Sequence, residues 1–167
     1  GVGTIGGGCV EGDIWFAAKM LLRDGGPAEH KDYKLNEELA AQDGLVCGGT
    51  MYFLIDPVYR PEEYQTYANE IVRAYEGGPP VALISLVKTG KAKGIVGTKL
   101  FVRQDGSTIG SLGDPAWDAL AKKQAAGLAP YGKDAYLELE DGVEAFLESY
   151  TTPPTLVLAG GGHISKA

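Results

Sequence analysis

Two glycine-rich segments, each with a cysteine, are the parts of this sequence best suited to chemistry. Three consecutive glycines at residues 6–8 allow positive φ angles and a close approach of the backbone to a ligand. Cys9 follows them, where a helical pattern begins. The free N–H groups and positive dipole of a helix start bind anions, commonly phosphate, and favour the thiolate of a nearby cysteine. A tight strand-to-helix turn with a small buried cysteine is the simpler interpretation.

The second segment, Cys47-Gly48-Gly49, stands just before an apolar run at residues 51–55. The chain has 2 cysteines, too few for a disulfide framework, so a reducing cytoplasm with both thiols free is expected. No metal site is predicted, because zinc needs four ligands and neither the cysteines nor the 2 histidines have suitable spacing. His30 is interpreted as a surface residue rather than a ligand.

Both segments must be positioned by flanking helices and strands. Apolar residues at helical spacing predict a helix over 10–24, which Gly25-Gly26-Pro27 stops. The apolar run at 51–55 predicts a buried strand. The other expected elements are strands at 30–35, 81–87, 97–103, 107–110, 135–139, 143–150 and 155–159, a helical turn at 36–41, and helices that start at Pro61 and cover 114–126. The apolar and aromatic stripe of the Pro61 helix is interpreted as core.

Composition and charge narrow the possible partners. The 167 residues carry a net charge of −7 and no aromatic–basic motif, which argues against a nucleic-acid partner. No apolar run approaches the about 20 residues of a membrane span, and no signal-peptide pattern is present, so no membrane partner is expected. Residues 81–103 contain only basic charged side chains. They are interpreted as a solvated hairpin face, with a small-anion site as the alternative.

The sequence also contains a degenerate internal repeat. The matching part of the first copy begins GTIGGGCVEGDIWFAAK, and that of the second copy begins STIGSLGDPAWDALAKK. Collinear matches join 3–19 to 107–123, 31–35 to 133–137, and 49–61 to 142–154. Two copies of one structural unit are therefore predicted.

The two copies differ in ways that bear on function. The second copy opens with residues 81–103, which have no counterpart in the first. The chain is therefore expected to be a fragment, or to receive the missing strands from elsewhere, and to have an open sheet edge. The second copy also lacks both cysteine segments. Their joint loss favours a functional role for Cys9 and Cys47 over two structural thiols packed against each other.

Three segments resemble the signatures of the XdhC/CoxI family, the xanthine dehydrogenase accessory proteins. They are GTIGGGCVEGD, GLVCGGTMYFLIDP and LVLAGGGHISKA, and residues 81–106 resemble the hairpin that opens the family's N-terminal domain. The resemblance implies a maturation factor rather than an enzyme. Such a protein binds the molybdenum cofactor, works with a cysteine desulfurase that supplies the metal's sulfido ligand, and delivers the cofactor to a xanthine dehydrogenase-like molybdenum hydroxylase. A cytoplasmic homo-oligomer is expected.

The resemblance also assigns residues and domains. The implied cofactor-binding residues are Gly6, Gly7, Gly8, Cys9, Cys47, Gly48 and Gly49, with thiolate roles for the two cysteines. Gly160, Gly162 and His163 match the opening of a Rossmann-like domain. The predicted fold is α/β (α+β), with two related mixed-sheet units and flanking helices, then the first Rossmann-like strand. The predicted domains are a first unit (1–60), a connecting helix (61–80), a second unit (81–152), and a linker that starts the Rossmann-like domain (153–167).

Two other functions remain open. A strand followed by Gly160 and Gly162 is the start of a dinucleotide-binding turn, so the chain could belong to an NAD(P)-dependent oxidoreductase. NAD(P) would then require the complete Rossmann-like domain, and turnover would need no client enzyme. Alternatively, the chain is a non-catalytic module that docks on a molybdenum hydroxylase, in which case docking survives the loss of both cysteines.

Overall fold

The structure is a computed structural model that describes residues 5, 9–35, 49–92 and 94–155. The described elements follow in the order α1 (Cys9–Asp24), β1 (Glu29–Leu35), β2 (Gly49–Ile55), α3 (Pro61–Tyr75), β3 (Val81–Lys88), β4 (Lys99–Arg103), β5 (Thr108–Gly110), α4 (Pro115–Leu128), a 3-10 turn (Ala129–Tyr131), β6 (Ala135–Glu140) and β7 (Val143–Tyr150). The expected turn at 36–41 and nearly all of the expected strand at 155–159 lie outside the described residues.

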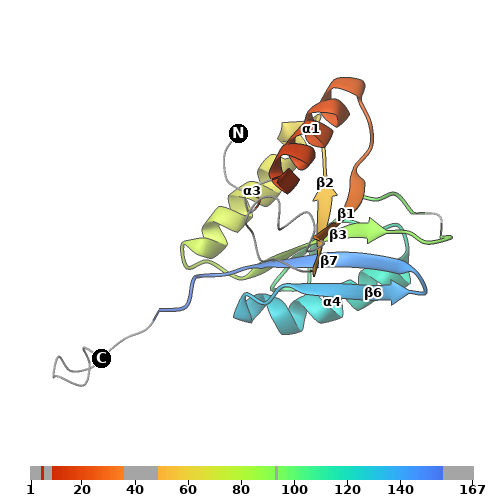
Figure 1. Cartoon of the computed structure of the whole chain (residues 1–167). Coiled ribbons are helices and arrows are strands. Elements are labelled where there is room, and N and C mark those ends of the chain that lie inside the picture. Colours follow the sequence, from red (N-terminus) through yellow and green to blue (C-terminus); the bar gives the residue numbers. More distant parts are fainter. Residues whose placement is uncertain (1–4, 6–8, 36–48, 93, 156–167) are drawn as a thin grey trace, which may run out of the picture.

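The described strands form two sheets (Figure 1). β1 and β2 make a hairpin, and the larger sheet has the order β5-β4-β3-β7-β6. The α/β class is confirmed, but the expectation of mixed sheets is wrong, because every described strand pair is antiparallel. Parallel neighbours need a crossover connection, whereas β3–β4, β4–β5 and β6–β7 are joined by short turns or loops.

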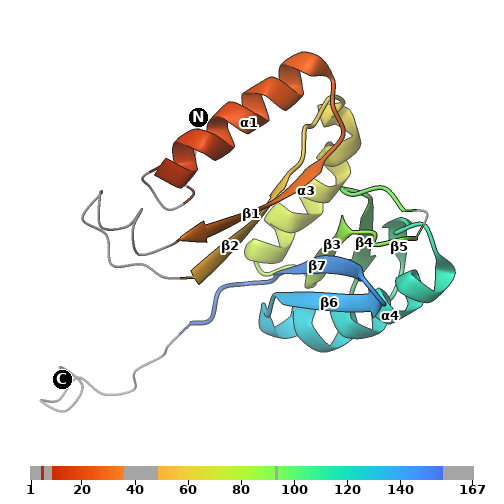
Figure 2. The same ribbon diagram turned by 45° about the vertical axis from the view of Figure 1, so that its right-hand side comes forward.

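Figure 2 shows these elements as stacked layers, with α1 above the β1–β2 hairpin, the five-stranded sheet below it, and α4 at the bottom. Helix α3 lies beside the hairpin on the same side of the five-stranded sheet. Both faces of β3 are therefore covered, which explains why Val81 to Val87 is an almost continuous apolar run.

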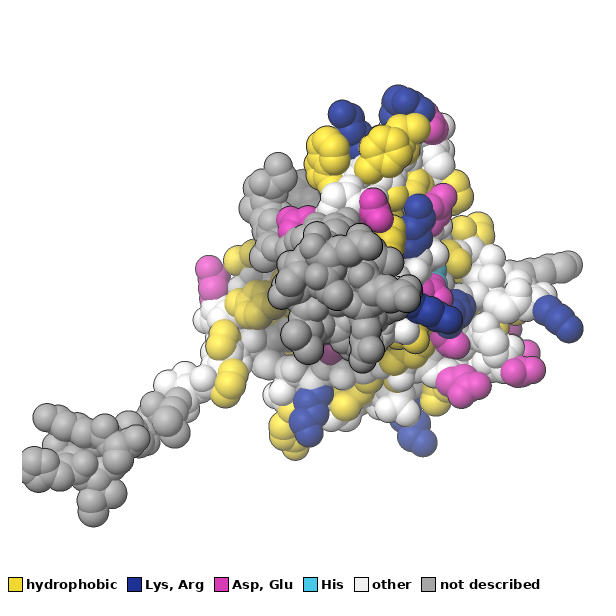
Figure 3. Space-filling model, viewed as in Figure 1, with side chains coloured by type: hydrophobic (Ala, Val, Ile, Leu, Met, Phe, Trp, Pro, Cys, Tyr) yellow, Lys and Arg dark blue, Asp and Glu magenta, His cyan; other side chains and the backbone are white. Residues whose placement is uncertain are grey.

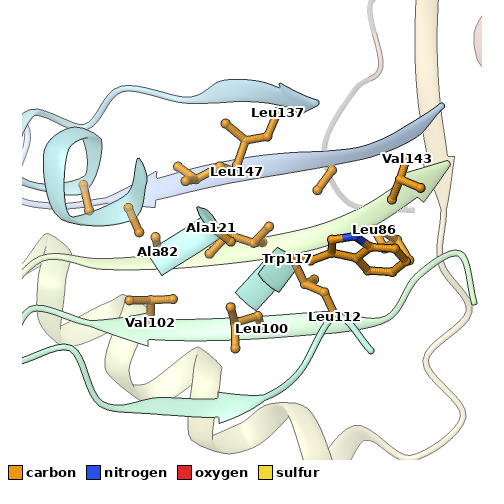
Figure 4. Close-up of a cluster of buried hydrophobic side chains, with 14 residues drawn as sticks. Ala82, Leu86, Leu100, Val102, Leu112, Trp117, Ala121, Leu137, Val143 and Leu147 are labelled. Atoms are coloured by element: carbon orange, nitrogen blue, oxygen red, sulfur yellow. The ribbon is translucent and has the colours of Figure 1, made fainter. Parts of the chain in front are cut away.

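The main core lies between the five-stranded sheet and α4 (Figure 4). Alternate residues of the strands point to this face, including Ile84, Leu100 and Leu147, each at most 1% exposed. Trp117 and Ala121 of α4 pack against them. Asp114 caps α4 by accepting a hydrogen bond from the Ala116 N–H at 2.7 Å, and Pro115 occupies the first turn, as the sequence pattern predicts.

The opposite face of the sheet receives α3. Ala74 packs with Val81 and Phe101 in a second buried cluster, to which Tyr67 and Ile71 add partly buried side chains. The interpretation of this helical stripe as core is confirmed. The charged face of α3 also contacts the sheet, because both oxygens of Glu70 accept hydrogen bonds of 2.6 Å from the guanidinium of Arg103.

The same order of elements occurs twice in the described chain. A helix followed by two antiparallel strands is found as α1-β1-β2 and again as α4-β6-β7. This order agrees with the internal sequence repeat, although the domain boundaries remain predictions. In the parts of the chain that the structure describes, no helix has the length and apolar character of a membrane span.

Candidate functional site

The structure describes part of the predicted cysteine site. Cys9 is the first residue of α1, as the glycine-loop pattern predicts, and Gly49 is the first residue of β2 with φ at 137°. Gly6, Gly7, Gly8, Cys47, Gly48, Gly160, Gly162 and His163 lie outside the described residues, so their assigned roles stay predictions.

The two elements that carry the cysteine segments begin at the same end of the hairpin unit. β1 and β2 pair so that Leu35 lies opposite Gly49, at the end of the hairpin where β2 begins. A turn at Gly25 reverses the chain between α1 and β1, so that the first turn of α1 lies at that same end (Figure 2). The start of α1 and the start of β2 therefore lie at the same end of the hairpin unit.

Packing and hydrogen bonds hold α1 on the hairpin. Ile14 and Leu21 of α1 are buried with Ile55 of β2. The Tyr59 hydroxyl, just after β2, donates to the backbone oxygens of Leu21 and Gly26 at 2.8 and 2.9 Å. These contacts position α1, and with it the helix N-terminus, relative to β2.

A groove of about 630 Å³ separates the hairpin from the five-stranded sheet. Aromatic rings and aliphatic side chains form its walls, and a few polar groups point into it. Its lining residues are His30, Tyr52, Phe53, Leu54, Asp56, Leu83, Ser85, Val87, Lys99, Tyr136, Phe146 and Glu148. Its volume falls in the range of small-molecule sites, which are typically apolar with a few placed polar groups.

One end of the groove contains a network around Lys99. The Lys99 ammonium lies 2.6 Å from Oδ2 of Asp56 and 3.3 Å from Oγ of Ser85. The Tyr64 hydroxyl donates to the same Asp56 oxygen at 3.4 Å. Because the Lys99 and Asp56 side chains are only 11% and 22% exposed, this ion pair is shielded from solvent and joins the hairpin unit to the sheet.

Two carboxylates lie on β7, and one of them, Glu148, lines the groove. Burial raises the pKa of Glu148, although a hydrogen bond with Tyr150 acts in the opposite direction. Glu144 accepts a hydrogen bond of 2.6 Å from Tyr136 and lies 2.9 Å from Nζ of Lys88. These two partners lower the pKa of Glu144, with the Tyr136 bond as the larger cause. The pKa values of these two carboxylates on one strand are thus shifted in opposite directions.

The interpretation of His30 as a surface residue is wrong. Its side chain is only 11% exposed and lines the groove, because β1 turns this position toward the five-stranded sheet. The ring stacks on Tyr52 with centroids 6.0 Å apart, and Nδ1 lies 3.3 Å from Oδ1 of Asp32. Nε2 is buried and has no hydrogen-bond partner among the residues that the structure describes. A buried polar atom of this kind is a candidate contact for a ligand.

In the described part of the basic stretch at 81–103, Lys91 is exposed, as the solvated-face interpretation expects, whereas three other basic residues are paired. Lys88, Lys99 and Arg103 each form an ion pair with an acidic residue from another element. The sequence interpretation missed the groove as a whole. The groove could have been found in the sequence from polar residues in its strands. These are Ser85 and Glu148 within β3 and β7, and Lys99 at the start of β4.

Over the described ranges, no group of three or more His, Cys, Asp or Glu side chains is arranged to hold a metal ion. Residues 74–139 match the model of the XdhC and CoxI family. The match runs from the end of α3 to β6 and confirms the family resemblance. No curated protein matches this sequence.

Proposed function

We propose that this chain, whose residues 74–139 match the model of the XdhC and CoxI family, acts in the maturation of a molybdenum hydroxylase. Its cargo is the molybdenum cofactor, a pterin dithiolene that carries a phosphate. The chain holds this cargo while a cysteine desulfurase supplies sulfur to the metal, and the cofactor then passes to a xanthine dehydrogenase-like client. The reducing cytoplasm is the proposed compartment, since the proposed chemistry needs free thiols.

The observation that carries the proposal is that α1 and β2 begin at the same end of the hairpin unit. Cys9 opens α1, and Gly49 opens β2 directly after the Cys47-Gly48 pair. Both segments therefore attach to one end of the hairpin unit, which is the arrangement required for two thiolates that serve one ligand. Thiolates are soft ligands and good nucleophiles, as molybdenum and sulfur-transfer chemistry both require.

The helix start also suits the cargo's phosphate. The first N–H groups of α1 have no partner within the helix and carry the positive end of its dipole. We propose that they bind the phosphate, with Gly6 to Gly8 as the cradle that lets it approach.

The groove, on the face of the hairpin opposite to α1, offers an aromatic surface for the flat ring system. Tyr52 lies three residues after Gly49 on β2, and Tyr136 and Phe146 line the same groove. Aromatic rings stack well against a flat heterocycle. The unpartnered Nε2 of His30 would meet its polar edge.

The proposal can be tested by retention of cargo. The protein with Cys9→Ser or Cys47→Ser would be purified from cells that make the cofactor, and bound molybdenum and pterin would be measured by mass spectrometry and by pterin fluorescence after oxidation. Each substitution is expected to lower both contents and to lower activation of an apo hydroxylase. Tyr131→Ser is the matched control, because Tyr131 is 75% exposed and does not line the groove.

Unchanged cargo and unchanged client activation in both cysteine variants would overturn the thiolate roles. Client binding that survives without any bound cofactor would instead indicate the docking module. Turnover of NAD(P) without a client would indicate the oxidoreductase, whose Gly160 and Gly162 lie outside the described residues.

A further inference from the structure

The groove between the hairpin and the five-stranded sheet presents aromatic rings that the fold leaves uncovered. Tyr52 of β2, Tyr136 of β6 and Phe146 of β7 all line it, and each is at least 36% exposed. Tyr136 lies directly opposite Phe146 in the strand register, so these two rings share one face of the sheet. Exposed apolar surface inside a concave site commonly marks a place where a ligand binds. Rings on both walls suit a flat ligand in particular.

His30 supplies an oriented hydrogen-bond acceptor on the hairpin wall of the groove. Its Nδ1 lies 3.3 Å from Oδ1 of Asp32, and because an ionised carboxylate can only accept, Nδ1 carries the proton. The neutral ring then has its lone pair at Nε2, the buried atom that has no hydrogen-bond partner in the described part of the chain. Stacking on Tyr52, with 22° between the ring planes, holds the imidazole in place. Nε2 is thus set to accept from an N–H group of a ligand.

Ser85 supplies a donor on the sheet wall of the same groove. This buried residue of β3 lies opposite Phe146 in the strand register, beside the aromatic rings. Its Oγ accepts from Nζ of Lys99 at 3.3 Å, so its own hydroxyl proton is available to donate to a ligand carbonyl. An acceptor on one wall and a donor on the other match a lactam edge, in which a ring N–H stands beside a C=O.

The charges that line the groove favour a neutral ligand. Among the described residues of its walls, Lys99 is the only Lys or Arg, and its ammonium already pairs with Asp56 at 2.6 Å. Glu148 adds an acidic side chain to the same walls, and burial raises its pKa. A phosphate or carboxylate would therefore meet an acidic group and a cation that is already neutralised, whereas an uncharged heterocycle meets neither cost.

We propose that this groove binds a neutral planar heterocycle with a lactam edge, whose N–H donates to Nε2 of His30 and whose carbonyl accepts from the Ser85 hydroxyl. The rings of Tyr52, Tyr136 and Phe146 contact its flat faces. Pterins and oxopurines both carry such an edge. A pterin source rests on the proposed function, since the cargo contains a pterin, whereas the site itself does not depend on the cysteine segments.

The test titrates the full chain with two probes of the same ring system. Lumazine is a bicyclic pteridine with ring N–H groups beside its carbonyls, and its dimethyl derivative keeps the rings and carbonyls but has a methyl group on each of those nitrogens. Calorimetry is expected to show that lumazine binds at least about tenfold more tightly, the effect of one hydrogen bond. Hypoxanthine, an oxopurine, separates the sources. Tighter binding of lumazine supports the groove as a pterin site, and tighter binding of hypoxanthine supports it as a site for a free purine.

Matched variants locate the contacts. His30→Phe keeps a ring that can stack on Tyr52 but removes the acceptor, so it should weaken lumazine binding about tenfold and barely change binding of the dimethyl derivative. Ser85→Ala should weaken both probes, because both retain the carbonyls. Tyr52→Ser should also weaken both, whereas Phe16→Ser should change neither. Phe16 is 59% exposed, as Tyr52 is, but it lies on α1, where hydrophobic side chains gather at the surface in Figure 3, and it does not line the groove.

Absence of lumazine binding, equal affinities for the two lumazines, or equal losses for them in His30→Phe would overturn the proposal. So would loss of lumazine binding in the Cys9→Ser and Cys47→Ser variants, because the groove would then not be the site. These outcomes are distinct from failure of the proposed function. Cysteine variants that retain their cargo overturn the thiolate roles even if lumazine binds as expected. Absence of lumazine binding overturns the groove site even if the cysteine variants lose their cargo.

Discussion

The Nζ atom of Lys99 on β4 lies 2.6 Å from Oδ2 of Asp56, the residue that follows β2. This pair joins the hairpin unit to the five-stranded sheet at the inner end of the groove. It is shielded from solvent, and its donor also contacts Ser85, so its two members are energetically coupled.

Removal of one member should therefore cost more than removal of both. Asp56→Leu or Lys99→Met is expected to lower the free energy of unfolding by about 3 kcal/mol, because each leaves a buried charge without its partner. The double variant should lose less unfolding free energy than the sum of the losses in the two single variants. Urea unfolding of the four proteins measures this coupling, and strictly additive losses would show that the pair contributes nothing.

Gly97 provides another contact between the five-stranded sheet and the segment of α1, β1 and β2. Its φ is 89°, and a Cβ at this position would lie within contact distance of the Cβ of Ala28, in the turn between α1 and β1. Gly97→Ala should thus lose stability from both backbone strain and a clash. Gly106→Ala is the control for strain alone, since Gly106 has φ 81° and open space around it.

The two causes can be separated by a second substitution. Ala28→Gly in the Gly97→Ala background should restore the part of the unfolding free energy that the clash removed. If Gly97→Ala lowers the unfolding free energy no more than Gly106→Ala does, the turn that contains Ala28 is not in close contact with the β3–β4 loop.

The bidentate pair of Glu70 and Arg103 predicts a pH dependence on the acid side. The hydrogen bond from Arg103 lowers the pKa of Glu70 below its ordinary value of 4.5. The stability that this pair contributes is therefore present above pH 4.5 and is lost as the pH falls through the lowered pKa. Glu70→Gln should cost about 1–2 kcal/mol at neutral pH, and the difference from the native protein should vanish in acid.

A surface pair gives the matched control for Glu70. Glu63 lies 2.8 Å from Arg60, but both side chains are at least half exposed, so Glu63→Gln should change stability little at any pH. Thermal unfolding at a series of pH values measures both variants. A constant difference for Glu70→Gln down to strong acid would contradict the assignment.

The raised pKa of Glu148 predicts a contribution to stability that falls as the pH rises. Burial raises its pKa in the folded protein, so its favourable contribution is fully present below the ordinary value of 4.5 and is lost as the pH rises through the raised pKa. Glu148→Gln removes this loss and should be more stable than the native protein at neutral pH, with the difference shrinking toward pH 4. A difference independent of pH would indicate that Glu148 is well solvated.

The main core predicts a large effect from a single truncation. Leu147 of β7 is fully buried between α4 and the sheet, so Leu147→Ala should cost about 2–5 kcal/mol. Leu22→Ala removes the same atoms from an exposed position and should change the unfolding free energy of this chain by less than about 0.5 kcal/mol. Comparable losses at the two positions would show that Leu22 is already covered.

The local elements could be predicted from sequence because their signals are local. The helix at α4 follows from the Asp114 cap and Pro115, and the apolar run of β3 indicates a strand with two covered faces. The expected mixed sheets failed for a nonlocal reason, since strand direction within a sheet depends on which strands become neighbours. The placement of His30 failed similarly, because its burial depends on a sheet more than fifty residues away in the chain.

By itself, the sequence determined the helices and strands, the repeated unit, and the two glycine–cysteine segments with their family resemblance. Those features depend on side chains close together in the chain, whose propensities and spacing act before any long-range contact forms. Only the tertiary structure decided that α1 and β2 begin at the same end of the hairpin unit, that a groove lies between the sheets, and that Lys99 meets Asp56 there. Strand register sets these relations, and burial strengthens the ion pair by excluding the water that would otherwise screen it.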